Sequence, residues 1–136
     1  MVQRLPGILE YLEACGDGLD DVFARFAAHE QRIGGRLLDY LDSRSDVRIV
    51  GRRDPAREHR VPTIAFTVQG KQVSEISEQC AKDRVGISHG DFYAARAIDA
   101  MGLREHGGVI RASMVHYNTV EDVDRLIGSL DRALAS

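Results

Sequence analysis

Residues 111–125 read Arg-Ala-Ser-Met-Val-His-Tyr-Asn-Thr-Val-Glu-Asp-Val-Asp-Arg, and this stretch decides the fold because it runs from a predicted strand through a polar turn into a helix. Side chains alternate along a strand, so Ile110, Ala112 and Met114 are expected on one face. Arg111 is expected on the other face, between two valines. The guanidinium has two possible roles there. It is solvated or forms a salt bridge, which spacing alone favours, or it binds an anion such as a carboxylate through two hydrogen bonds.

The second half of this stretch has the pattern of a surface helix. Thr119 is expected to cap the helix, and Asp122 stands three residues later in the place of a capping-box acid, where Glu or Gln is commoner. Apolar residues then recur at steps of three and four: Val120, Val123, Leu126, Ile127, Leu130 and Leu134. The pattern predicts a helix packed on a sheet.

The remaining elements follow from periodicity and from glycine or proline breaks. Helices are predicted at residues 5–14, 19–42 and 73–83, strands at 47–51, 63–68, 85–88 and 109–115, and an exposed loop at 52–60. The order strand, helix, strand predicts a right-handed crossover to a parallel neighbour at 85–88, with 109–115 antiparallel beside them. The pair Gly34-Gly35 inside the longest helix predicts a kink or the close approach of another backbone, or is equally a tolerated weak spot.

These elements predict an α/β (α+β) fold with a small mixed sheet of three or four strands covered by helices. We expect one domain over residues 1–136, in which 1–43 form linking and packing helices and 44–136 form the mixed-sheet part. Length and composition agree, because 136 residues with 43% hydrophobic and 29% charged side chains suffice for one core.

Composition also excludes some classes of function. The net charge is −3, from 18 basic and 21 acidic residues, so no basic excess is present for nucleic-acid phosphates. No apolar run approaches the ~20 residues that cross a bilayer, and no leader pattern precedes the first helix. We therefore expect a cytoplasmic protein that binds neither nucleic acid nor membrane.

Metal and phosphate sites are not indicated. The two cysteines, Cys15 and Cys80, are far apart and fit neither a disulfide framework nor a zinc site, and Cys80 is in step with the apolar residues of its helix. The five histidines show no ligand spacing, and the glycine-rich phosphate-binding motifs are missing. We expect no metal site.

A candidate site loop reads His89-Gly-Asp-Phe-Tyr-Ala94. It places His89, Asp91 and Tyr93 at the end of a predicted strand, where α/β proteins often carry their sites. His89 could move a proton and Tyr93 could donate one. The alternative, which spacing favours, is a turn that bends at Gly90 and docks Phe92 in the core.

The same residues carry a family resemblance. Arg-Ala-Ser at 111–113 followed by Tyr-Asn-Thr-Val-Glu-Asp-Val-Asp-Arg-Leu at 117–126 resembles the closing segment of class V aminotransferases, specifically their cysteine desulfurase-like members. Upstream, Val-Pro-Thr-Ile-Ala-Phe-Thr-Val at 61–68, the loop at 86–94 and the Met-Gly-Leu helix end at 101–103 follow in the same order. The chain thus resembles the small C-terminal domain of these fold type I enzymes, over nearly its whole length.

The resemblance implies specific roles. The arginine of the Arg-x-Ser motif holds the substrate α-carboxylate in that family, a role that falls here on Arg111, with residues 89–93 lining the entrance. The cofactor of the intact enzyme is pyridoxal 5'-phosphate, the substrate is an amino acid, and members form dimers. In cysteine desulfurases the loop carries a catalytic cysteine just ahead of an alanine, and Tyr93 takes that place here.

A second departure concerns the cofactor. Family members bind it as a Schiff base on a lysine of a large domain, typically after a histidine. The two lysines of this chain, Lys71 and Lys82, lie in the small-domain part, and neither follows a histidine. We expect no covalent cofactor, identify no catalytic or cofactor-binding residue, and expect the chain to act as a substrate-side domain that lacks the large domain and is inactive alone.

Two other readings stay open. One is a free-standing, non-catalytic α/β module that binds a small ligand or a protein partner through the sheet face bearing Arg111. The other is a structural dimerisation domain. Within the enzyme reading, the sequence leaves desulfurase, lyase and transaminase (transferase) chemistry undecided.

Overall fold

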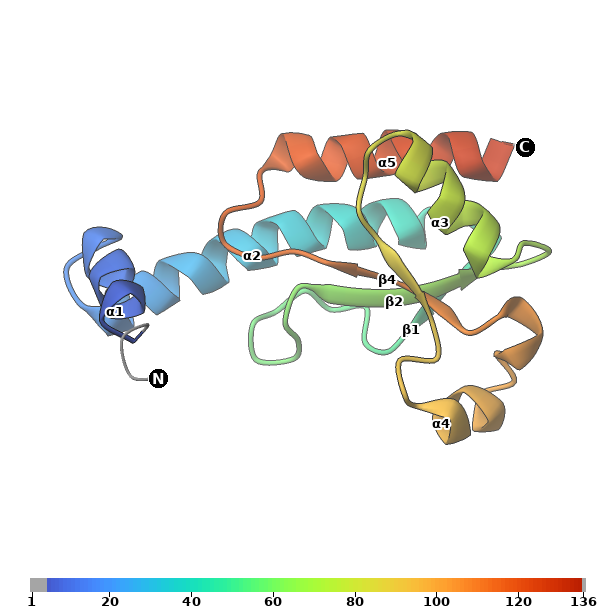
Figure 1. Ribbon diagram of the computed structural model, residues 1–136, viewed down its shortest axis with the longest axis horizontal. Helices are drawn as coiled ribbons and strands as arrows, with labels where there is room; N and C mark the ends of the chain where they lie inside the picture. Colours follow the sequence, from blue (N-terminus) through green and yellow to red (C-terminus); the bar gives the residue numbers. More distant parts are fainter. Residues whose placement is uncertain (1–4, 136) are drawn as a thin grey trace.

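A four-stranded sheet forms the centre of the molecule, in a computed structural model that describes residues 5–135 (Figure 1). Residues 1–4 and 136 of the predicted single domain lie outside the described residues. The strands are β1 (Val47–Val50), β2 (Thr63–Val68), β3 (Ser88–Gly90) and β4 (Val109–Ser113), in the spatial order β1-β2-β4-β3. The helices are α1 (Leu5–Ala14), α2 (Leu19–Asp42), α3 (Val73–Lys82), α4 (Ala95–Ala100) and α5 (Val120–Ala135), with a short 3-10 helix at Arg104–His106.

The α/β (α+β) class is confirmed, but the predicted parallel neighbour is wrong. β4 lies between β2 and β3 and pairs antiparallel with both, and β1 pairs antiparallel with β2. β2 and β3 therefore point the same way without touching, and the sheet is antiparallel rather than mixed. The third strand also starts later than predicted, since the Val85 amide donates to the Cys80 carbonyl at 2.8 Å and so belongs to the end of α3.

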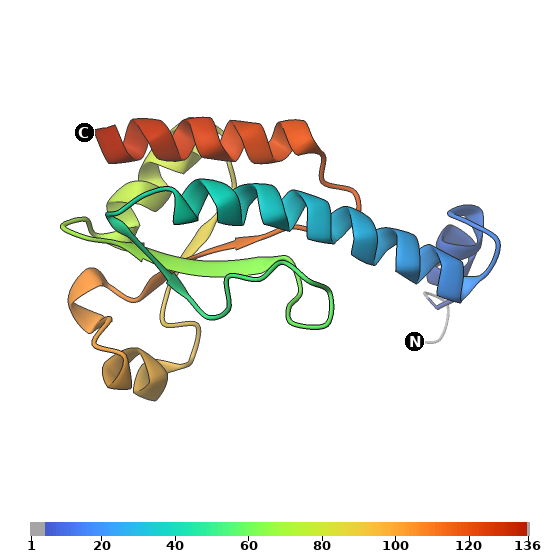
Figure 2. The same cartoon turned by 180° about the vertical axis from the view of Figure 1, so that it is seen from behind.

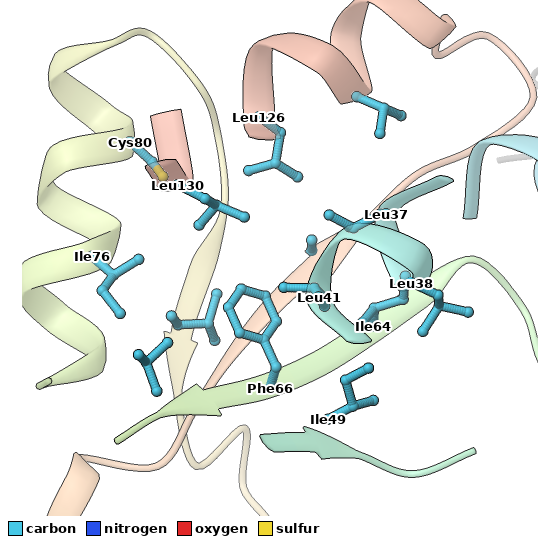
Figure 3. Close-up of a cluster of buried hydrophobic side chains, with 14 of the residues drawn as sticks. Leu37, Leu38, Leu41, Ile49, Ile64, Phe66, Ile76, Cys80, Leu126 and Leu130 are labelled. Carbon is cyan, nitrogen blue, oxygen red and sulfur yellow. The ribbon is translucent and has the colours of Figure 1, made fainter. Parts of the chain in front are cut away.

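Helices α2, α3 and α5 cover one face of the sheet (Figures 1 and 2). The predicted alternation of the last strand is confirmed, because Ile110, Ala112 and Met114 are buried in this core. Phe66 of β2 lies at its centre, and Cys80 of α3 is also buried there, as predicted (Figure 3). The core fixes which face of β4 is turned outward.

Capping fixes the start of α5. The Asp122 amide donates to the Thr119 hydroxyl at 3.1 Å, and the Thr119 amide donates to the Asp122 carboxylate at 3.0 Å. This is the predicted capping box, with Asp in place of Glu. It sets the angle at which the chain leaves β4.

Among residues 5–135, α4 and its flanking turns lie on the other face of the sheet (Figure 1). Ile98, Leu103 and Val109 form a small second apolar cluster there, with Phe92 packed against it. Much of the second face therefore remains open around the middle of β4.

Within residues 5–135, none of the helices is both long and apolar enough to cross a membrane.

Candidate functional site

Arg111 lies at the centre of the open sheet face. It belongs to β4, opposite Ala65 of β2 and Ser88 of β3 in the register, and residues directly opposite in an antiparallel pair share a face. Its side chain is exposed, and its guanidinium carbon lies 4.0 Å from the centroid of the Phe92 ring. Arginine over an aromatic face at this distance makes a cation–π contact.

The donor edge of this guanidinium is unused. Within residues 5–135 the guanidinium makes no hydrogen bond or ion pair. Its polar interaction is the cation–π contact with the Phe92 ring. Nearby arginines differ: Arg48 donates to the Met101 carbonyl at 3.3 Å, and Arg104 donates to the Asp99 carboxylate at 2.8 Å. The Arg104 guanidinium also holds the pKa of Asp99 below its usual range. The Asp99 carboxylate is thus already paired, while the Arg111 guanidinium has no anionic partner among residues 5–135.

The loop under Arg111 is built on an unusual backbone. Gly90, Phe92 and Tyr93 all have positive φ angles, of 125°, 50° and 62°. The Asp91 carboxylate accepts the Tyr93 amide at 3.0 Å, and the Asp91 carbonyl accepts the Ala94 amide at 2.8 Å. Asp91 therefore forms the turn, which is the common role of a short acidic side chain in a loop.

A glycine that the sequence analysis overlooked holds this loop in place. Gly108 has a φ of +101°, and a Cβ there would lie 2.4 Å from the carbonyl oxygen of Gly90. Gly90 opens the loop that carries Phe92, so the two backbones meet where the loop starts. The signal in the sequence was the pair Gly107-Gly108 just before a strand, because paired glycines before a strand often permit a close approach of two backbones.

The other candidate residues lie apart from Arg111. His89 is opposite Ile110 in the register and therefore belongs to the helix-covered face, where it is exposed at the sheet edge. Tyr93 is fully exposed. The structure thus brings Arg111 together with Phe92 and with Ser88, and not with the imidazole.

Residues with hydroxyl groups share the sheet face of Arg111. Ser113 follows it by two residues on the same face, and the Thr63 hydroxyl lies 3.2 Å from that of Ser113 on the neighbouring strand. Ser88 lies on the other side, in β3. These groups can both donate and accept hydrogen bonds, so they suit a polar ligand held by the arginine.

The two lysines lie outside the strand and the loop that form this site. Lys82 ends α3, which packs on the opposite face of the sheet, and Lys71 lies in the turn just before that helix. In the described part of the chain, no group of three His, Cys, Asp or Glu side chains could hold a metal ion.

Comparisons with known proteins agree with one another. The family of aminotransferase class-V matches residues 9–126. Aminotransferase-like protein FGM3 of Gibberella zeae is 35% identical over 120 residues, which are 88% of this chain and 30% of that protein. Probable cysteine desulfurase 2 of Mycobacterium leprae is 29% identical over 133 residues, which are 98% of this chain and 29% of that protein.

A solved structure extends the likeness to the fold. The crystal structure of the cysteine desulfurase CsdA from Escherichia coli matches with a TM-score of 0.72 at 25% identity, covering 93% of this chain and 28% of that one. The chain spans roughly 30% of the length of these two relatives.

Proposed function

The chain belongs to the aminotransferase class-V family, and from this we propose that it provides the substrate-side part of a pyridoxal-phosphate enzyme that acts on an amino acid. Arg111 binds the α-carboxylate of that substrate. The observation that carries the proposal is the exposed, unpaired guanidinium of Arg111 at the centre of the open sheet face.

The chemistry of the group suits this role. A guanidinium presents two parallel N–H donors that match the two oxygens of a carboxylate, and such pairs fix orientation as well as position. Holding the α-carboxylate at one point leaves the substituents at the α-carbon in a fixed direction, which is what a reaction at that carbon requires. Ser88 and Ser113 can donate to the same anion or to its neighbouring polar groups.

The cofactor must come from elsewhere. Pyridoxal phosphate, when bound, supplies an electron sink for reactions at the α-carbon. Lys82 ends α3 on the helix-covered side of the sheet, and Lys71 lies in the turn between β2 and α3. We propose that a larger cofactor-binding part provides the lysine and that residues 5–135 alone are inactive. The greater length of the relatives supports this division.

The loop at residues 89–94 has no cysteine, which bears on the class of reaction. Cys80 is fully buried, and burial raises the pKa of its thiol, whereas Cys15 lies in the turn after α1. Tyr93 stands in the loop instead. We propose that the reaction proceeds without a thiol from this loop.

Carboxylate binding can be tested on the isolated chain by NMR of the arginine Nε–Hε groups. Titration with sodium acetate at constant ionic strength, balanced with chloride, should move the Arg111 signal, and acetamide should not. The Arg111→Leu variant should lose the acetate response, while Arg52→Gln, which removes an exposed loop arginine, should keep it. An equal response in Arg111→Leu would refute the proposed role.

The cofactor division has its own test. The chain is incubated with pyridoxal phosphate, reduced with borohydride and digested for mass spectrometry. We expect no specific adduct. A stoichiometric adduct confined to Lys71 or Lys82 would overturn the proposal that the lysine lies in another part of the protein.

A further inference from the structure

We infer that Phe92 is a positioning residue for Arg111, because its ring holds one face of the guanidinium and leaves the donor edge directed at a carboxylate. This inference rests on the proposed role of Arg111. It adds a requirement that the family resemblance did not supply, namely an aromatic ring at position 92.

The geometry allows ring and anion to bind together. The guanidinium carbon of Arg111 lies over the Phe92 ring, 4.0 Å from its centroid. A carboxylate pairs instead with the edge, in the plane of the guanidinium. The ring contacts the group at its central carbon, so the N–H edge stays available to the anion.

A free arginine side chain in this place would sample many rotamers. Arg111 stands on an open sheet face with no hydrogen-bonding partner among residues 5–135, and a long side chain loses considerable entropy when a ligand fixes it. A ring that already restricts the guanidinium reduces that loss before the ligand arrives. Phe92 therefore acts through Arg111 and not by touching the substrate.

The position of the ring is itself strongly determined. Phe92 has a φ of +50°, a conformation that a bulky residue rarely adopts. Its side chain packs against the cluster of Ile98, Leu103 and Val109, and the Asp91 turn fixes the backbone. A strained residue that its surroundings hold in place points to a function that needs the position.

The competing explanation is that Phe92 only docks the loop on the apolar cluster. Two substitutions separate the explanations. Phe92→Leu keeps an apolar side chain against the cluster and removes the ring, while Phe92→Tyr keeps the ring. A docking role predicts that leucine serves well, and a positioning role predicts that only tyrosine does.

The experiment uses the Nε–Hε and Cδ proton signals of Arg111 in the isolated chain. Protons over an aromatic face are displaced upfield, so Arg111 should be upfield of exposed arginines such as Arg52 in the wild type and in Phe92→Tyr. The displacement should vanish in Phe92→Leu. The dissociation constant for acetate should rise about two- to fivefold in Phe92→Leu, as expected for loss of an exposed cation–π contact, and stay within about twofold in Phe92→Tyr.

The outcomes separate the two proposals. If acetate moves Arg111 equally in the wild type and in Phe92→Leu, or if the upfield displacement is missing from the wild type, the positioning role is refuted while carboxylate binding stands. If acetate does not move Arg111 in the wild type, the proposed function fails. Amide spectra of residues 95–103 report whether Phe92→Leu still folds, and retained signals there combined with weaker acetate binding support the inference.

Discussion

Substitution of Gly108 by alanine should displace the loop that carries Phe92. A Cβ at this position would lie 2.4 Å from the Gly90 carbonyl oxygen and 2.5 Å from the carbonyl carbon, both of them backbone atoms. Ordinary contacts require about 3.5 Å, so one strand must move by roughly 1 Å. β3 is three residues long and pairs only with β4, so it is the element that yields.

The magnitude can be worked out against a matched control. Gly51 has a φ of +110°, close to the +101° of Gly108, but a Cβ there would meet nothing within 4 Å. Gly51→Ala therefore measures backbone strain alone, about 1–3 kcal/mol. Gly108→Ala adds the clash, for which overpacking costs about 1–3 kcal/mol more. Against a typical total of about 5–15 kcal/mol, the difference is measurable.

Urea unfolding followed by circular dichroism gives the free energy of unfolding of both variants. Amide exchange should become faster at Gly90 and Val109, which pair across β3 and β4, in Gly108→Ala and not in Gly51→Ala. The upfield displacement of the Arg111 signal should also weaken, because Phe92 moves with the loop. If both variants lose the same stability and Arg111 is unaffected, contact between the two glycines does not set the loop.

Two further predictions concern the helices. Gly34→Ala should stabilise the protein by about 0.5–1 kcal/mol in urea unfolding, because alanine has the higher helix propensity and its Cβ would meet Pro62 at an ordinary 3.6 Å. A lower free energy of unfolding would mean that the segment around Pro62 needs the glycine. The Ser129 hydroxyl donates to Asp83 at 2.6 Å and lowers the pKa of that carboxyl, so its contribution to stability is present above the unfolded pKa and is lost as pH falls through the folded pKa. Ser129→Ala should raise the pKa of Asp83 in a carboxyl NMR titration, and an unchanged pKa would assign the shift to Arg132 and Gln79 instead.

Local patterns predicted most of the elements. The ends of α1, α2 and β2 agree with the prediction, since each has a clear apolar period and a glycine or proline break beside it. The long helix passes through Gly34 and Gly35 without interruption. A Cβ added at either glycine would meet proline atoms only at ordinary distances of 3.6 Å or more, so a tolerated weak spot fits best.

Pairing between distant strands could not be predicted in the same way. The order strand, helix, strand suggested a parallel neighbour, yet β4, which begins at Val109 well after β3 ends at Gly90, enters between β2 and β3. Which strand occupies the centre depends on the total apolar surface that the sheet can bury against α2, α3 and α5, and no local period records this. The predicted start of the third strand failed for a related reason, because the end of α3 captures Val85.

The candidate site was predictable only in part. Alternation along β4 placed Arg111 outward, since the core defines the opposite face. The face on which His89 lies depends on its pairing with Ile110. This strand register cannot be read from the sequence. The approach of Phe92 to Arg111 was equally hidden, because it depends on a loop conformation that a bulky residue seldom adopts.

Departures from local rules concentrate at one place in this chain. Within residues 5–135, the non-glycine residues with positive φ are Arg84, Phe92 and Tyr93. Arg84 follows α3, where a left-handed residue commonly ends a helix, so that departure has a local cause. Phe92 and Tyr93 occupy the middle of the turn that Asp91 forms, and the ring of Phe92 lies against a mid-strand arginine whose guanidinium has no anionic partner among the same residues. A bulky residue held at positive φ beside a cation without an anionic partner is the combination that supports an anion site here.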